Sequence, residues 1–150
     1  MFLSKKSTNG LKALMALARR EGKGLIIIAD LAREERIPKK FLEAILLALK
    51  NGGILHSRIG KGGGYSLAVP AGKLTVGRII RILEGDYAPL SCLRDTKYAH
   101  CTECDGMELC GIRQVMADVH RAVASVLDTA LLSGMVERSE ARKQIVEYSI

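Results

Sequence analysis

The spacing of apolar residues predicts three helices in the first fifty residues. The first is expected to run from about Ser7 to Arg20, with Ser7 and Thr8 as its candidate N-caps. A short helix should end near Glu35, and a third should cover residues 39–50, where a preceding proline favours a helix start. The apolar residues expected on the inward faces of the first and third helices are Leu11, Leu14, Met15, Leu17, Ala18, Phe41, Leu42, Ile45, Leu46 and Leu49.

Two short strand-like segments follow, separated by a glycine-rich loop. Residues 54–58 and 65–68 flank the loop 59–64, which reads Ile-Gly-Lys-Gly-Gly-Gly. This arrangement predicts a β-hairpin with a basic tip. An earlier apolar run, residues 25–28, is expected to form a strand or a strand-like connector. Thr75 can cap a further helix, whose expected inward residues are Val76, Ile79, Ile80 and Leu83.

Residues 111–134 show the heptad spacing of a helix that pairs with another helix. We expect a homodimer, although a helix packed on its own domain can show the same stripe. Gly134 is expected to end this helix, and residues 135–150 to form a charged, partly mobile tail. The apolar positions alternate in steps of four and three, and those predicted to form the dimer interface are Ile112, Met116, Val119, Val123 and Val126.

The order of these elements is typical of a winged helix-turn-helix. We therefore predict a mainly α fold with a small β-hairpin wing and a long C-terminal dimerisation helix. The expected organisation is a DNA-binding domain over 1–84, a cysteine-rich sensor loop over 85–110, the dimerisation helix over 111–134 and the tail over 135–150. A hydrophobic content of 48% with only 4% aromatic residues agrees with a core of aliphatic side chains on packed helices.

Charge is divided unevenly along the chain. Residues 1–81 hold 16 Lys and Arg against 5 Asp and Glu, whereas residues 82–150 hold 7 against 11, which together give the net charge of +7. A basic front half predicts binding to a polyanion, and double-stranded DNA is the partner that suits the predicted fold. No apolar run reaches the roughly 18 residues that span a bilayer, and no signal-peptide pattern is present. We therefore expect a cytoplasmic protein without a membrane partner.

The third predicted helix is the candidate reader of DNA bases, because recognition helices place their first turns in the major groove. Lysine can pair with guanine or a phosphate, and glutamate can accept a hydrogen bond from cytosine N4. At the hairpin tip, Arg58 and Lys61 would attract phosphates, and the neighbouring glycines would let the backbone approach them or the minor groove. The predicted reader residues are Lys39, Lys40, Glu43 and Ala44.

The chain resembles the BadM/Rrf-type winged-helix regulators over nearly its whole length. The segments that carry the resemblance are Lys6–Leu14 in the first helix, Pro38–Glu43 in the reader, Gly60–Tyr65 in the wing and Leu74–Ile80 after it. The resemblance implies a homodimer crossed through the long helix and a partly palindromic operator.

The resemblance also assigns DNA-contacting positions. It implies that Lys40, Glu43 and Ala44 occupy the base-reading positions of the third helix. The predicted DNA contacts are completed by residues in the matching segments, namely Thr8, Gly63 and Tyr65. Ile59 departs from the family pattern, in which an arginine usually precedes the wing glycine.

Four cysteines lie within a short stretch at the spacing C-x8-C-x2-C-x5-C, and these are the candidate metal ligands Cys92, Cys101, Cys104 and Cys110. The residues alone leave open an iron–sulfur cluster of the 2Fe–2S or 4Fe–4S type, a structural zinc, and a metal-free thiol–disulfide switch. The resemblance favours a cluster, since sensors of this family hold clusters in this loop. His100 is a further candidate ligand, although a solvated loop residue is the simpler interpretation.

The predicted function is a transcription regulator whose operator affinity is controlled by a cluster, or by metal or redox state, at the four-cysteine loop. One alternative is a zinc or thiol–disulfide regulator of the same fold, and another is a zinc-bearing dimerisation module that does not bind DNA. An enzyme is not expected, because no Ser/His/Asp order or paired-carboxylate cleft can be argued.

Overall fold

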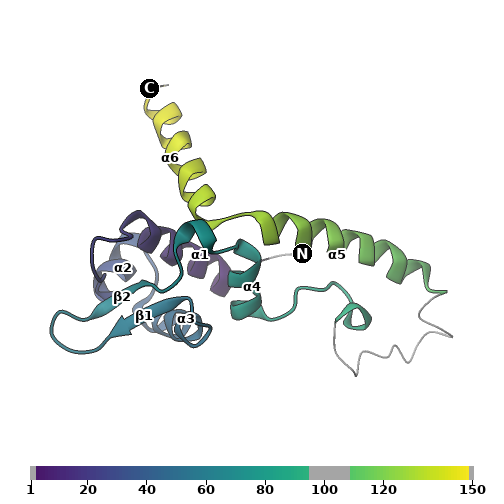
Figure 1. Ribbon diagram of the computed structural model, residues 1–150, viewed down its shortest axis with the longest axis horizontal. Helices are drawn as coiled ribbons and strands as arrows, with labels where there is room; N and C mark the ends of the chain where they lie inside the picture. Colours follow the sequence, from purple (N-terminus) through teal and green to yellow (C-terminus); the bar gives the residue numbers. More distant parts are fainter. Residues whose placement is uncertain (1–2, 95–108, 149–150) are drawn as a thin grey trace.

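The computed structural model describes residues 3–94 and 109–148, and Figure 1 shows a winged-helix unit from which two helices project. The described part is mostly helical with one two-stranded antiparallel hairpin, which confirms the predicted fold class. Its elements are α1 (Lys5–Arg19), α2 (Ile28–Glu35), α3 (Lys39–Asn51), β1 (Leu55–Arg58), β2 (Gly64–Leu67), η1 (Ala71–Lys73), α4 (Val76–Glu84), η2 (Ser91–Leu93), α5 (Gly111–Thr129) and α6 (Leu132–Tyr148).

Helices α1, α3 and α4 pack around one aliphatic core, to which α2 contributes Leu31. The predicted inward residues of α3 are buried from Leu42 onward, but Phe41 is 37% exposed. Phe41 lies in the first turn of α3 and is not among the buried residues that form the core. The largest side chains that are completely enclosed include Leu14, Leu42, Ile45, Leu46, Leu49, Ile79 and Ile80.

Helix α1 begins earlier than the sequence predicts, because its N-cap is Ser4. The Ser4 hydroxyl oxygen accepts a hydrogen bond of 3.1 Å from the backbone N–H of Ser7, which satisfies one of the open donors of the first turn. Ser7 is therefore a buried residue inside the helix and not its cap. The Thr8 hydroxyl is exposed and donates to the Ser4 carbonyl at 3.0 Å.

The hairpin pairs Leu55 with Leu67 at its base and Arg58 with Gly64 at its tip. The predicted strand-like connector forms a single bridge at Ile26, whose N–H and carbonyl each bond to the backbone of Tyr65 at 2.9 Å. A Cβ atom on Gly64 would collide with the Ile26 carbonyl, so this close backbone approach requires glycine. The hairpin is thus fixed to the segment that leads into α2.

The C-terminal region differs from the prediction of one helix to Gly134 followed by a tail. Helix α5 ends at Thr129, and Gly134 lies inside a second helix, α6, that continues to Tyr148. The chain breaks between them because its backbone pairs with the segment before α4: Val76 N–H bonds to the Ala130 carbonyl at 2.8 Å and Leu132 N–H to the Leu74 carbonyl at 2.9 Å. Burial of Leu132 in the core accompanies this break.

Leu132 is expected to carry much of the attachment of α6. Replacing a completely buried leucine with alanine removes apolar contacts and leaves a cavity, so Leu132→Ala should lower the free energy of unfolding by about 2–5 kcal/mol. The matched control is Leu47→Ala, since Leu47 is exposed on α3, and its effect should stay below about 1 kcal/mol. Urea unfolding followed by circular dichroism measures both, and equal losses would contradict this account of α6.

Candidate nucleic-acid interface and cysteine loop

Helix α3 presents an exposed face on the side opposite its buried stripe. The turn before it is formed by Arg36, which closes α2 in the left-handed conformation at φ 54°, and by buried Ile37. Pro38 is the N-cap of α3 and gives no side-chain hydrogen bond, so the first backbone N–H groups remain available to an anion. We call this surface the reader face, after its predicted role, which stays a prediction. Its exposed residues are Lys39, Lys40, Glu43 and Ala44, with Leu47 one turn further along.

We define the wing as residues 55–67. Its tip is a tightly closed turn. Gly63 N–H bonds to the Gly60 carbonyl at 2.9 Å, and Arg58 Nη2 donates to the Gly62 carbonyl at 3.2 Å. Arg58 and Lys61 are both exposed, and the guanidinium of Arg58 bonds across its own loop. Tyr65 is only half-buried and its backbone fixes the wing to Ile26. The structure thus displays the predicted wing residues at one end of the molecule, and their DNA contacts stay a prediction.

Two of the four cysteines lie on elements that contact each other. Cys92 is in η2 and Cys110 is the N-cap of α5, and η2 packs against α5. Both cysteines are half-buried. Cys101, Cys104 and His100 lie outside the described residues. Over 3–94 and 109–148 no three His, Cys, Asp or Glu side chains come together as a metal site, so the predicted ligand set stays a prediction.

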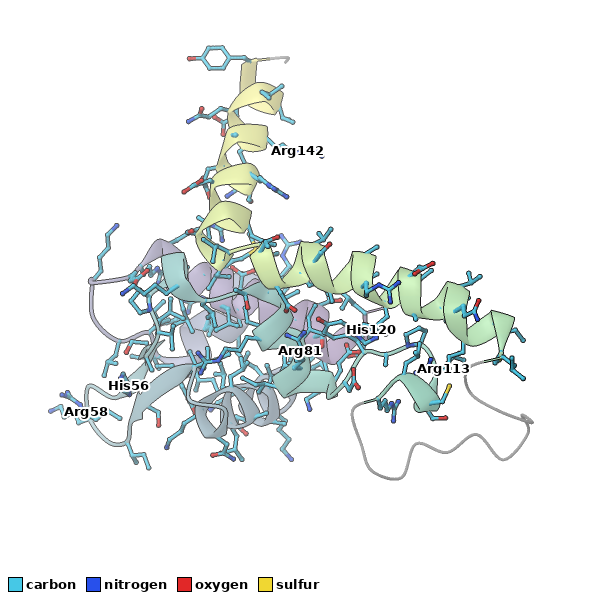
Figure 2. The ribbon with its side chains drawn as sticks, turned by 45° about the vertical axis from the view of Figure 1, so that its right-hand side comes forward. His56, Arg58, Arg81, Arg113, His120 and Arg142 are labelled. Carbon is cyan, nitrogen blue, oxygen red and sulfur yellow. The ribbon has the colours of Figure 1, made fainter. Side chains whose placement is uncertain are left out.

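A buried polar atom lies close in sequence to Cys110. Arg113 follows it within the first turn of α5, and its Nε is buried with no acceptor among the described residues. Figure 2 shows Arg113 and His120 on the underside of α5, facing the segment that leads from α4 to η2. A buried N–H group that has no acceptor among the described residues is expected to donate a hydrogen bond to some other group.

An ion pair that the sequence did not reveal joins α4 to α5. Arg81 binds both carboxylate oxygens of Asp128, with Nη1 to Oδ1 at 2.6 Å and Nη2 to Oδ2 at 2.8 Å. Arg81 Nη2 also donates to the Tyr87 hydroxyl, and the guanidinium lies over the Tyr87 ring at 4.8 Å from its centroid. The Tyr87 ring contacts His120 with centroids 5.6 Å apart. The start of the cysteine loop is therefore linked to both helices.

The electrostatics of this junction follow from its geometry. Hydrogen bonds from Arg81 hold the pKa of Asp128 below its ordinary value. Burial raises the pKa of Tyr87, although the neighbouring Arg81 charge acts in the opposite direction. Gly77 allows the close approach, because a Cβ atom there would collide with an Asp128 carboxylate oxygen.

Helix α5 extends away from the winged-helix unit and buries none of its residues completely (Figure 1). Of the predicted interface residues, Ile112, Val119 and Val126 are exposed, and Met116 and Val123 are partly buried. This apolar stripe is uncovered in the single chain, and pairing through it stays a prediction. No helix in the described parts of the chain has the length and apolar character to cross a membrane.

These features define a winged helix-turn-helix protein with a helical arm and a cysteine-bearing loop. Residues 3–138 match a family described as an iron-dependent transcriptional regulator. The chain belongs to this family, Rrf2.

Known relatives extend over the full chain. A putative Rrf2-like HTH-type regulator of Rhodobacter capsulatus is 32% identical over 148 residues, which cover 97% of this chain and 99% of that protein. The structure of CymR, named the global cysteine regulator of B. subtilis, has a TM-score of 0.76 at 27% identity and covers 92% of this chain and 98% of its own. The T. potens IscR structure has a TM-score of 0.72 at 25% identity and covers 95% and 90%.

The Arg81–Asp128 pair is expected to contribute stability above about pH 4 and to lose it as pH falls. The folded-state pKa of Asp128 is depressed, so this contribution disappears as the carboxylate takes up a proton. Asp128→Asn should lower the free energy of unfolding at pH 7 by about 1 kcal/mol or less, because the two side chains are 44% and 41% exposed.

Denaturant unfolding of wild type and Asp128→Asn between pH 7 and pH 3 provides the test. The difference between the two should shrink toward zero at the acid end. Asp118→Asn is the control, since it removes the same charge from the exposed side of α5. A difference that is independent of pH would show that the pair does not stabilise the junction.

Proposed function

We propose that this Rrf2-family regulator acts as a homodimer that grips double-stranded DNA with α3 and the wing. The observation that carries this proposal is the exposed, basic first turn of α3, held on a rigid core beside a basic, tightly closed hairpin. An exposed cationic surface of this shape suits a polyanion that offers a groove for a helix and phosphates for a loop. Neighbours of the same fold are named as regulators, which supports this conclusion.

Each residue of the reader face has a role that its chemistry allows. In the major groove, Lys40 would donate to guanine or a phosphate, and Glu43 would accept from cytosine N4. The methyl group of Ala44 would contact a thymine methyl. On the wing, Lys61 would bind phosphate, while the open amides at the start of α3 would add a further phosphate contact.

The stripe on α5 gives the proposed dimer its interface. Exposed Ile112, Val119 and Val126 are spaced by seven residues, which places them along one side of the helix. A second copy of this helix is the occupant whose heptad spacing matches the stripe. Two copies related by a twofold axis would present two reader helices, so the operator should be partly palindromic.

We further propose that the cysteine loop holds an iron–sulfur cluster through Cys92 and Cys110 together with Cys101 and Cys104. Two observations support this proposal: Cys92 lies in η2, which contacts α5, and Cys110 is the N-cap of α5, where an anionic group is stabilised. A thiolate or sulfide is also the kind of acceptor that Arg113 Nε lacks. When bound, a cluster would make the loop responsive to iron supply and oxidation.

The junction at Arg81 gives the loop a physical route to the reader helix. Tyr87 lies at the start of the loop, and its contacts with Arg81 and His120 connect it to both α4 and α5. Because α4 packs against α3, a shift of Tyr87 would alter how the arm holds the reader. We propose that the state of the cysteine loop changes DNA affinity through this contact, because it would change the angle at which α5 leaves the winged-helix unit.

A metal-free thiol switch is the second candidate. It is favoured by the similarity to CymR of B. subtilis, a protein named as a cysteine regulator, and by the half-buried state of both described cysteines. In this alternative two thiolates lose two electrons to an oxidant and form a disulfide. The same loop and the same junction would transmit the change.

DNA binding should depend on Lys40 and on salt. Lys40→Ala should weaken binding to the preferred operator by about 1–3 kcal/mol if Lys40 pairs with a base. Lys61→Ala should weaken binding to all duplexes alike and reduce the slope of log affinity against log salt by about 1. Arg142→Ala is the control, because Arg142 lies on α6, far from the wing in Figure 2, and removes one charge as well. Fluorescence anisotropy at several salt concentrations measures these effects.

The proposed function fails if the wild-type protein, in every metal and oxidation state, binds duplex DNA in dilute salt no better than a neutral control protein. Equal losses in Lys40→Ala and Arg142→Ala would show that only the total charge matters. That result would remove α3 as the reader.

Protein purified without oxygen should contain iron and sulfide in matched amounts and absorb visible light. Cys101→Ala and Cys110→Ala should lose both, because each removes a proposed thiolate ligand. Ser91→Ala, next to Cys92 in η2, serves as the control and should keep them. Zinc alone would overturn the cluster in favour of a structural metal. No metal, together with a loop disulfide after oxidation detected by mass spectrometry, would establish the thiol switch.

A further inference from the structure

The most exposed large aliphatic side chain of the winged-helix unit is at the tip of the wing. Ile59 is 94% exposed, directly between the end of β1 and the glycine turn. Exposure of one apolar residue is common, but here it occurs on a surface that otherwise displays cations such as Lys61. Ile59 contributes almost nothing to the core, so its side chain is available for burial against a ligand.

The turn beneath Ile59 is held in shape by its own hydrogen bonds. The Gly60–Gly63 bond closes it, and the guanidinium of Arg58 bonds to the Gly62 carbonyl on the other side. A Cβ atom on Gly63 would collide with the Arg58 carbonyl, so glycine at this position allows the two sides of the turn to pack closely. Arg58 therefore braces the loop, and the side chain that projects freely beside it is that of Ile59.

The wing tip lies on the same side of the molecule as the reader face. One groove between α3 and the hairpin is lined by Leu47 and Lys50 from α3 and by Arg58 and Ile59 from the wing. Leu47 continues the reader face by one helical turn, since it follows Lys40 by seven residues and Glu43 by four. A duplex contacted by α3 would therefore pass the apolar tip, with two cations of the groove beside its phosphates.

We propose that Ile59 is an apolar wedge that enters the minor groove beside the site read by α3, and that it makes binding depend on the deformability of the base step it meets. This inference rests on the proposed DNA binding. Apolar side chains inserted from the minor groove partly unstack base steps and bend the duplex, with a cost that is lowest at flexible TA and CA/TG steps. Ile59 thus selects sequence through shape, without hydrogen bonds to bases.

Two substitutions of Ile59 separate this role from a general effect of charge or folding. Ile59→Ser removes the apolar surface and should lower affinity about tenfold for duplexes with a TA step at the wing position, which corresponds to burial of part of one aliphatic side chain. Its salt slope should equal that of wild type, because no charge changes. Ile59→Leu, which keeps an apolar side chain, should restore most of the affinity.

The experiment selects bound duplexes from a pool randomised beside the operator half-site, with wild type, Ile59→Ser and Ile59→Leu at one salt concentration. Wild type and Ile59→Leu should enrich TA or CA/TG steps and bend the selected DNA, as measured by energy transfer between its ends. Ile59→Ser should lose both the enrichment and the bend. Thermal unfolding should be unchanged, since the Ile59 side chain is almost fully exposed.

Failure of this inference is distinguishable from failure of the proposed function. If wild type binds duplex DNA and Ile59→Ser shows the same affinity, step preference and bend, the wedge is wrong and DNA binding stands. If wild type binds no duplex, both are wrong. Runs of A are stiff and have a narrow minor groove, so their enrichment by wild type would also overturn the wedge.

Discussion

The bidentate pairing of Arg81 with Asp128 joins the half of the chain that presents α3 to the half that carries the cysteines. It is reinforced by backbone bonds that tie Ala130 and Leu132 to the segment before α4. These contacts fix where α5 leaves the winged-helix unit and so fix the direction of its apolar stripe. In the proposed mechanism, a signal from the cysteine loop reaches α3 through this junction, because Tyr87 at the start of the loop contacts Arg81. In the proposed dimer, the position of the α3 surface therefore depends on a few polar contacts.

Close backbone approach is the second constraint. Glycine at position 77 lets Asp128 reach Arg81, and glycine at position 64 lets the hairpin pair with Ile26. In both places the Cβ atom of an alanine would collide with an atom that takes part in these contacts, so glycine is required for packing. The wing shows the same principle in a different role, because its glycines close the tip tightly enough to leave Ile59 and Lys61 projecting outward. A wing tip that is already held in one shape loses less conformational entropy when it binds a ligand.

Much of the fold could be predicted because burial follows local periodicity. The stripe from Leu42 to Leu49 identifies α3 and its exposed face, and the glycine-rich loop identifies the wing. Local patterns were less successful at element ends. Ser7 has the chemistry of an N-cap, yet Ser4 takes that position, and Phe41 has the chemistry of a core residue, yet it lies beyond the core. These differences depend on where an element meets its neighbours, which periodicity does not record.

The sequence by itself determined the class of the protein: the winged helix-turn-helix, the basic surface that α3 and the wing present, and the grouping of four cysteines. Each follows from residue type and short-range spacing. Only the tertiary structure decided that the C-terminal region is two helices, that Arg81, Asp128, Tyr87 and His120 meet, and that Arg58 braces the wing while Ile59 projects from it. Arg81 and Asp128 are 47 residues apart. Contacts over such separations arise from the packing of whole elements, and no local pattern of residues encodes them.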